Sequence, residues 1–490
     1  MSAPCSGAPR AISNIVSACG LWRKRAVSIA PRVLYNTAER GFLPTQRAEA
    51  YRRDRQLEES GENLGTAAAS APRGEMLRNI AETFGTRALL LGVNFAVSVA
   101  TARMLLEEGR GLLAVAMFIG SVGIQLSGLG LHTSSVYFPA RDRTLIGPVL
   151  ANAMAVCLAA GLISAAGAAA VARFRPDLFS IDGSLLFLAL LYIPVGQTIT
   201  VASNMLLGMK DVRAFNISTI GPPVILLALL CAAYFTGGAT PVSALAMAIV
   251  SMIPLAAWGT ARIARQASGR PEFSPALLKE MFSYGARAYA AAFPAFLVFR
   301  VDIILIFKYL GAAEAGIYSI SVALAGLLRI LPQVAGQIVH PKLCGMDSWD
   351  EKLALTKKTA LGITAATLPA IAAAALLAKP LIVLFYGKAF APAAVPFLLT
   401  LPGIFAWNLQ SVVGKILISD GYSGKIVVAW FAALAVNLGL NITLIPRMGL
   451  PGAAIAFSAA LIALSAAILF IIFSTDRKMR RAGASGGETD

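Results

Sequence analysis

Apolar stretches that are long enough to cross a bilayer recur along most of this chain, and they restrict its fold more than any other feature. About 20 helical residues span the hydrocarbon core, where every backbone polar group must be bonded within the protein. The sequence therefore predicts an all-α polytopic membrane protein. About twelve spans are expected, near residues 84–105, 111–137, 145–172, 184–208, 216–236, 241–263, 284–309, 314–340, 359–385, 394–418, 426–446 and 452–474.

The composition favours a membrane protein over a soluble one. Charged residues make up 14% of the chain, whereas an average soluble domain has about 25%. The formal net charge of +17 would suggest nucleic-acid binding in a soluble protein, but here the Lys and Arg residues lie mainly in short loops and in both tails. We interpret them as a positive-inside bias with attraction to anionic lipid, and predict no nucleic-acid partner.

The distribution of Lys and Arg between the loops predicts the orientation of the chain. The predicted loops on one side, including the two longest at 262–283 and 341–358, carry most of these residues. We therefore place this side, with both termini, in the cytoplasm. The predicted loops on the other side are all short, so they leave no room for an extramembrane enzyme domain.

The predicted spans divide into two halves. Residues 1–75 are basic and lack a sustained apolar run, which predicts a disordered N-terminal extension; a start assigned too early is the alternative, because Met76 would open the membrane domain naturally. The other predicted segments are a six-helix half (76–263), a cytoplasmic linker (264–283), a second six-helix half (284–474) and a basic cytoplasmic tail (475–490).

A weak internal repeat supports this division. The segment LLEEGRGLLAVA (105–116) aligns with LGAAEAGIYSIS (310–321), which places Gly111 on Gly316. Six spans return the chain to the same side, so the halves would be parallel repeats about an axis along the membrane normal, with the substrate site between them. A chance alignment of turns rich in Leu, Gly and Ala is the alternative.

Charged residues inside the predicted spans are the candidate site, because charges at membrane depth are costly and usually line a polar cavity. Arg300 and Asp302 lie in the seventh span, and Arg329 lies near the middle of the eighth. Arg87 and Arg287 lie in the first turns of the first and seventh spans. This excess of cations predicts a central cationic cavity for an anionic head group such as phosphate or pyrophosphate, for which Arg offers bidentate donors.

Each of these charges also has a structural interpretation. Arg87 and Arg287 lie near the predicted cytoplasmic boundary, where long side chains can snorkel. Arg300 and Asp302 are two residues apart, so on a helix they point in nearly opposite directions, and each would find a partner on another helix. Asp302 is therefore either a helix tie or, as the deepest acid, a candidate for ion coupling by protonation.

Side-chain amides in the spans add polar groups that could bind sugar hydroxyls or neighbouring helices. The sequence does not choose among them; they are Asn94, Gln125, Gln197, Asn408, Gln410, Asn437 and Asn441.

Motifs of catalysis and metal binding are missing from the sequence. It contains no GxxxxGK[ST] loop and no HExxH pair, and its five Cys and two His residues are scattered. We therefore predict a protein that is not an enzyme and has no cofactor or metal. Its transport would draw on an ion gradient, the membrane potential or downhill flow of substrate.

Three stretches carry ordered motifs. Residues 102–141 form a hairpin pattern, and residues 282–343 combine an R-x-D pair, a G-x-Y-S turn and a proline-containing exit. Residues 380–461 carry LPG and the spaced run N-L-G-L-N, L-I-P and G-A-A. These motifs resemble the polysaccharide, or O-antigen type, flippases of the multidrug/oligosaccharidyl-lipid/polysaccharide export (MOP) superfamily. The FYG at 385–387 departs from the plainer FG of that family.

The resemblance implies a lipid flippase of the bacterial inner membrane that takes part in surface polysaccharide biosynthesis, such as that of lipopolysaccharide or exopolysaccharide. Its substrate would be a polyprenyl-pyrophosphate-linked oligosaccharide, turned from the inner to the outer leaflet by alternating access. Arg300 and Arg329 would attract the pyrophosphate, with Arg87 and Arg287 near the inner mouth. Membrane lipids and polysaccharide polymerase or assembly proteins are the implied partners.

Three other functions stay open on the sequence. A cation-coupled multidrug exporter of the same superfamily would handle organic cations, which an Arg-rich cavity should repel. A membrane-bound polymerase or ligase of lipid-linked glycans would need larger outer loops. A non-transporting component of a polysaccharide assembly complex would have the same sequence features as a flippase.

Overall fold

The structure is a computed structural model that describes residues 73–174, 181–268, 271–346, 348–419 and 424–485. Every regular element in these residues is helical, which confirms the predicted all-α fold. The chain divides into two units, Met1–Thr83 and Phe84–Asp490, and the membrane-spanning segments lie in the second. Nearly all of the predicted extension 1–75, and the last five residues of the predicted tail, lie outside the described residues.

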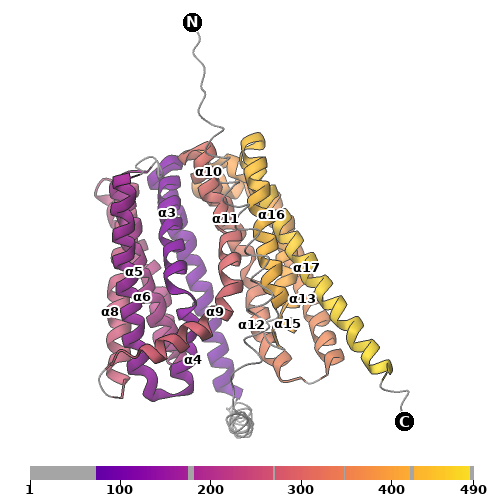
Figure 1. Ribbon diagram of the computed structural model, residues 1–490. Coiled ribbons are helices and arrows are strands. Elements are labelled where there is room, and N and C mark those ends of the chain that lie inside the picture. The colour runs from indigo at the N-terminus through magenta and orange to yellow at the C-terminus, as the bar shows by residue number, and fades with distance from the viewer. Residues whose placement is uncertain (1–72, 175–180, 269–270, 347, 420–423, 486–490) are drawn as a thin grey trace. The chain divides into compact units, whose positions relative to one another are not determined.

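The described helices follow one another with short connections (Figure 1). In chain order they are α3 (Arg73–Gly128), α4 (Leu131–Arg141), η1 (Arg143–Leu145), α5 (Ile146–Phe174), α6 (Gly183–Gly208), α7 (Val212–Phe235), α8 (Pro241–Gln266), α9 (Pro275–Val298), α10 (Val301–Leu310), α11 (Ala312–Leu328), α12 (Ile330–Cys344), α13 (Trp349–Tyr386), η3 (Lys388–Ala393), α14 (Ala394–Val413), α15 (Lys415–Ser419), α16 (Gly424–Met448) and α17 (Leu450–Ser485).

The structure has eleven membrane-spanning helical segments among its described residues, and the first of these segments contains two of the twelve predicted spans. Within the described residues, eleven helical segments are long and apolar enough to cross a membrane, the first being Leu89–Gly128. Two helices meet inside this segment at Leu106, whose φ of 56° and ψ of −166° are not helical. Arg110, just after the break, bonds back to Ser98, so the two helices lie side by side. Both predicted crossings are therefore present.

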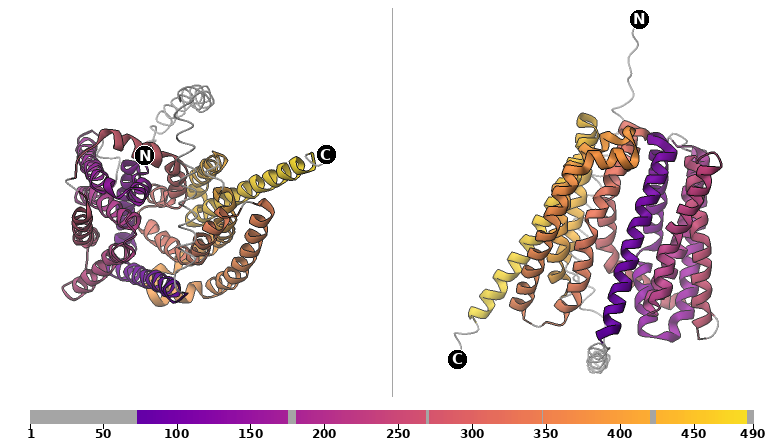
Figure 2. Two further views of the ribbon diagram at one scale, coloured as in Figure 1. Left: turned by 90° about the horizontal axis from the view of Figure 1, so that it is seen from below. Right: turned by 180° about the vertical axis from the view of Figure 1, so that it is seen from behind.

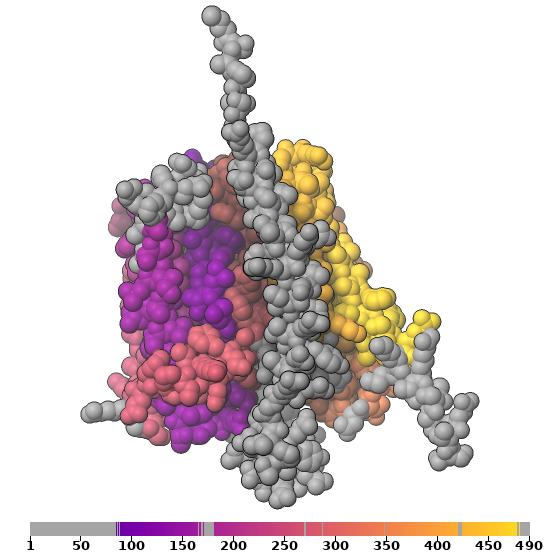
Figure 3. Space-filling model, viewed as in Figure 1, coloured from indigo at the N-terminus to yellow at the C-terminus, as the bar shows by residue number. Residues whose placement is uncertain are grey.

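The helices gather in two groups. In the view from below, α3 to α8 lie on one side and α11 to α17 on the other (Figure 2, left). The helix α9 belongs to both groups, because it packs against α4 of the first half and α16 of the second. Its first turns lie across the first-half helices in the space-filling view (Figure 3).

Two surface polar contacts hold turns of the first half in place. Asp211 caps α7 by accepting a hydrogen bond from the amide of Ala214, and it also pairs with Arg262 of α8 at 2.7 Å. Because α7 and α8 are consecutive antiparallel spans, this pair joins the start of one to the end of the other. Asp211 lies outside the membrane-spanning segments, and Arg262 lies near the end of the segment Pro241–Gln266.

One apolar cluster joins the two halves. Ala102 and Val115 of the first half are buried together with Ile306, Tyr318 and Tyr386 of the second. The cluster lies at the same end of the spans as the Leu106 break. Burial of such side chains stabilises the contact between the halves in proportion to the apolar area covered.

Close backbone contact accompanies this cluster. A Cβ atom on Gly111 would overlap the carbonyl oxygen of Ala312, and a Cβ on Gly316 would overlap that of Glu107. The repeat alignment places Gly111 on Gly316 and therefore Glu107 on Ala312. The contact is reciprocal, as it is where a twofold axis passes between equivalent residues. This geometry supports the predicted parallel relation of the halves.

Candidate functional site

A central cavity of about 400 Å³ lies between the two halves. Three arginines line it, Arg110, Arg300 and Arg329, together with hydroxyl groups that include those of Ser98 and Ser319. No Asp or Glu lines this cavity among the described residues. The predicted central cationic cavity is therefore present, although one of its arginines was not among the predicted site residues.

Arg300 lies at a break between two helices. The helix α9 ends at Val298 and α10 begins at Val301, so Arg300 leaves the helical path and its side chain lines the cavity. The side chain is exposed to this space, and it has no hydrogen-bond or ion-pair partner among the described residues. A cation at membrane depth without a protein partner favours an anionic ligand.

Arg329 lies at the next such break, between α11 and α12. Its guanidinium carbon is 4.3 Å from the ring centre of Phe299 and 5.6 Å from that of Trp407. Cation–π contacts of this kind hold the flat guanidinium group in place without neutralising its charge. Its Nε atom is buried and has no hydrogen-bond partner, which leaves a donor available to a ligand.

Arg110 is the cavity arginine that the sequence reasoning missed. The sequence places it in a loop between the first two spans, but the structure places it in the helix that begins after Leu106. Its guanidinium donates to the hydroxyl groups of Ser319 (3.2 Å), Ser98 (3.2 Å) and Thr101. Neutral hydroxyls leave the charge of Arg110 uncompensated. Ser98 and Thr101 are three residues apart and therefore share one helix face, and this spacing was the signal in the sequence that could have indicated a polar site near Arg110.

The other two predicted cations lie apart from this group. Arg87 is exposed on α3 and does not line the central cavity. Arg287 lies in α9, but its side chain falls outside the described residues. The structure therefore brings together Arg300 and Arg329, with Arg110, and does not add Arg87 to them.

Asp302 points away from the cavity into the second half, where only 2% of its surface is exposed. Its carboxylate accepts hydrogen bonds from the hydroxyl of Tyr318 (3.0 Å) and the amide of Asn441 (2.7 Å), on α11 and α16. Asn437 lies beside it, and neither polar atom of its amide makes a hydrogen bond of good geometry. Asp302 thus has partners on two other helices and does not pair with Arg300.

Metal-binding clusters are not found in the part of the chain that the structure describes. No group of three or more His, Cys, Asp or Glu side chains there is close enough to hold an ion. The polar groups around Asp302 include a single carboxylate, with amide and hydroxyl oxygens.

The helical arrangement is shared with solved transporter structures. The lipid II flippase MurJ, in an inward closed conformation, has a TM-score of 0.63 at 15% identity, over 81% of this chain and 87% of that chain. An inward-facing multidrug resistance MATE family transporter of the MOP superfamily has a TM-score of 0.56 at 17% identity, over 82% and 96%. The MATE multidrug transporter DinF-BH, solved with a bound ligand, has 0.55 at 16%, over 79% and 92%. At these identities the similarity shows the fold.

Sequence comparison adds the family. No curated protein sequence matches this chain significantly. A family model described as "Polysaccharide biosynthesis protein" matches residues 100–395, which is more than half of the 490 residues and includes all three cavity arginines. The resemblance stated from the sequence motifs is confirmed. On this evidence the chain belongs to the polysaccharide biosynthesis protein family and has the helical fold of the MOP superfamily.

Proposed function

We propose that this protein is a flippase that moves a polyprenyl-pyrophosphate-linked oligosaccharide from the inner to the outer leaflet. The observation that carries the proposal is the cluster of three arginines around a cavity whose described lining has no acid. A buried charge without a partner costs free energy that an anionic ligand would recover. Pyrophosphate fits because Arg300 and Arg329 can each offer paired N–H donors.

The lipid tail needs no binding site in this cavity, because it can remain in the bilayer while the head group crosses. The two halves would alternate between states open to either side, with the arginines accessible in both. The Lys and Arg distribution supports a cytoplasmic location for both termini. The resemblance to polysaccharide flippases implies insertion in a bacterial inner membrane. Assembly proteins such as a polysaccharide polymerase would receive the product.

Drug export is the second function that the fold permits. One of the solved transporters with this fold is a multidrug transporter with a bound ligand. In the cavity of this chain, however, three uncompensated arginines would repel an organic cation. The cavity charge therefore favours an anionic substrate over a cationic one.

The decisive experiment is complementation of a strain that lacks the gene. We expect the knockout to lose surface polysaccharide and to accumulate lipid-linked oligosaccharide in the inner leaflet, where an impermeant periplasmic glycosidase cannot reach it. Expression of the full chain should restore surface polysaccharide and remove the accumulated oligosaccharide from the inner leaflet. If the oligosaccharide reaches the outer leaflet without this protein, the flippase proposal fails, and resistance to cationic dyes becomes the property to measure.

Asp302 is proposed to couple flipping to an ion gradient by gaining and losing a proton. Asp302→Asn keeps the shape and part of the hydrogen bonding, so we expect normal amounts of folded protein whose flipping in proteoliposomes no longer responds to an imposed pH gradient. Asp302→Ala also leaves two buried donors without an acceptor, at about 1–3 kcal/mol each, and should lower the melting temperature.

A helix tie predicts a different result. If Asp302 only joins α10 to α11 and α16, Asp302→Asn will flip substrate with the gradient response of the unaltered protein, and only the alanine variant will be impaired. Asp211→Asn is the matched control, because Asp211 is an acid outside the membrane-spanning segments, paired with Arg262.

A further inference from the structure

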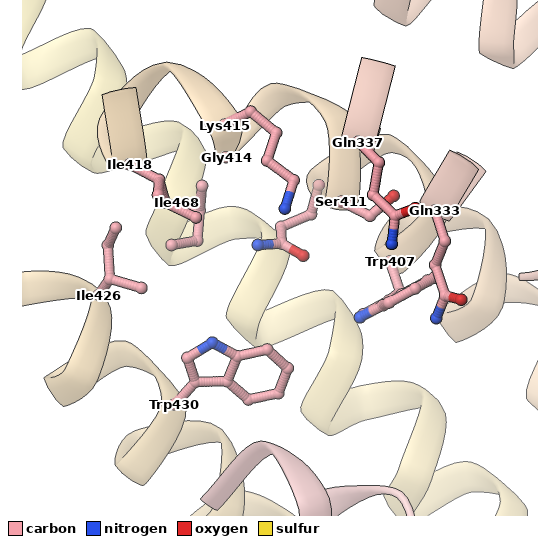
Figure 4. Close-up of a pocket in the computed structure, with 11 residues that line it drawn as sticks. Gln333, Gln337, Trp407, Ser411, Gly414, Lys415, Ile418, Ile426, Trp430 and Ile468 are labelled. Atoms are coloured by element: carbon pink, nitrogen blue, oxygen red, sulfur yellow. The ribbon is translucent and has the colours of Figure 1, made fainter. Parts of the chain in front are cut away.

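A second cavity, of about 420 Å³, lies entirely within the C-terminal half (Figure 4). Side chains from α12, α14, α15, α16 and α17 line it. Its polar members are Gln333, Gln337, Gln410, Ser411 and Lys415, and two tryptophans, Trp407 and Trp430, form aromatic walls. We call this space the C-half pocket. It shares no lining residue with the central cavity.

The amides of the C-half pocket are not used by the protein itself. The side chains of Gln333, Gln337 and Gln410 make no hydrogen bond to another described residue, and neither does the amine of Lys415. Gln333 and Gln337 are four residues apart, so they lie on one face of α12. Figure 4 shows the Lys415 amine directed into this space, which Gln410 also lines. Gln333 and Gln337 are exposed, so their amides are free to bind a polar ligand that enters this space.

The two tryptophans supply flat apolar surfaces beside these amides. In Figure 4 the ring of Trp430 borders the space opposite Lys415, and Trp407 borders it beside Gln333. An aromatic face with polar groups around it suits a ligand that has both an apolar C–H face and a polar edge. Sugar rings have this character: hydroxyls around the rim and C–H groups on the faces.

Other ligand classes fit the C-half pocket less well. A lipid chain has no polar group that could form hydrogen bonds with the three amides and the amine. A polyanion would meet one cation, Lys415, whereas the central cavity offers three. The pocket has no carboxylate, His or Cys among its lining residues, which are the side chains that hold most metals. Amides can both donate and accept, so they match hydroxyl groups, which do the same.

The position of Trp407 connects the C-half pocket to the arginines. Trp407 lines the pocket, and its ring also makes a cation–π contact with the guanidinium group of Arg329, which lines the central cavity. Gln333 and Gln337 follow Arg329 on α12 by four and eight residues, or about 6 and 12 Å along the helix axis. A molecule with its anionic group at Arg329 could therefore extend an attached polar group into the pocket.

We infer that the C-half pocket is a carbohydrate site that holds sugar units of the substrate glycan while its pyrophosphate occupies the arginine cavity. The inference rests on the proposed function and assigns the glycan a separate subsite. Trp430 stacks on a sugar face, and Gln337 and Gln410 bind hydroxyls. Lys415 donates to a hydroxyl or to the carboxylate of an acidic sugar. The pocket would thereby contribute to the choice of glycan, and the arginines would bind the part common to all such substrates.

The test uses the full chain in lipid nanodiscs and two probes. One probe is the repeat-unit oligosaccharide released by mild acid from the host's own surface polysaccharide, freed of lipid and phosphate; the other is inorganic pyrophosphate. Binding is followed by quenching of intrinsic tryptophan fluorescence. We expect Trp430→Ala and Gln337→Leu each to weaken oligosaccharide binding about tenfold, the loss of roughly one good contact, and to leave pyrophosphate binding unchanged.

The controls separate this inference from the proposed function. Arg300→Ala should lose pyrophosphate binding, and Trp258→Phe, on α8 outside both cavities, should alter neither affinity. Gln337 is exposed, so its variant remains informative if Trp430→Ala does not fold. Oligosaccharide binding that is unchanged in Gln337→Leu and Trp430→Ala would overturn the pocket assignment. Binding of pyrophosphate without any binding of oligosaccharide would overturn it too, while leaving the flippase proposal intact.

Discussion

Replacing Arg300 or Arg329 with alanine should slow flipping of lipid-linked oligosaccharide by about 10- to 100-fold. A hydrogen bond to a charged group contributes about 1.5–3 kcal/mol, and each 1.4 kcal/mol corresponds to tenfold. Neither guanidinium forms an ion pair with a described residue, so its removal strands no buried acid. Protein amounts in the membrane should therefore stay close to normal. The rate is measured in proteoliposomes by the sidedness of a fluorescent lipid-linked substrate.

Conservative variants sharpen this prediction. Arg300→Lys keeps the charge but loses the paired donors, so an intermediate rate is expected. Arg329→Lys also loses the flat group that stacks on Phe299 and Trp407, and should be the more impaired of the two lysine variants. Arg262→Ala, which removes a surface cation, is the control. Normal expression with an unchanged rate in the double variant Arg300→Ala/Arg329→Ala would refute the role of both residues.

The second large effect is expected at the contact between Gly111 and Gly316. A single added methyl group in Gly111→Ala would overlap the carbonyl oxygen of Ala312, and backbone has little freedom to move aside. Overpacking of this kind costs about 1–3 kcal/mol. We expect the halves to separate at this end, which would lower the melting temperature by several degrees and stop the transport cycle, because one of the alternating states could no longer close.

Cysteine accessibility measures that separation directly. A cysteine placed at Ser319, beside the central cavity, should react faster with an impermeant thiol reagent from the outer side in the Gly111→Ala background. Gly439→Ala is the matched control, because a Cβ there would have no neighbour within 4 Å. An unchanged melting temperature and an unchanged flipping rate in Gly111→Ala would show that the close contact is not needed.

The fold was predictable because span length and apolar content are local properties of the sequence. The membrane core demands about 20 apolar residues per crossing, and all twelve predicted stretches have a helical counterpart among the described residues. The site was less predictable. Arg110 was assigned to a loop because nothing in the sequence marks Leu106 as the residue with positive φ, four residues before it.

Long-range contacts explain the rest of what the sequence left open. Asn441 was one of seven candidate amides, and its bond to Asp302 joins residues 139 apart in the chain. The C-half pocket combines two glutamines of α12 with tryptophans of α14 and α16, and no spacing along the sequence indicates that these helices meet. Arg300 and Asp302 were expected to point in nearly opposite directions on one continuous helix; in the structure Arg300 lies at a helix break and lines the central cavity, and Asp302 does not line it.

The glycine contact between the halves has a consequence for the medium outside the cell. It is built from backbone atoms: glycine Cα groups and the carbonyls of Glu107 and Ala312, rather than from paired charges. Salt weakens interactions between exposed charges, and protons remove them, but neither acts on contact between backbone atoms. On the side that we propose to face outward, ionic strength and acidity are set by the environment. The glycine contact between the two halves should therefore be equally stable in fresh water, in brine and in acid.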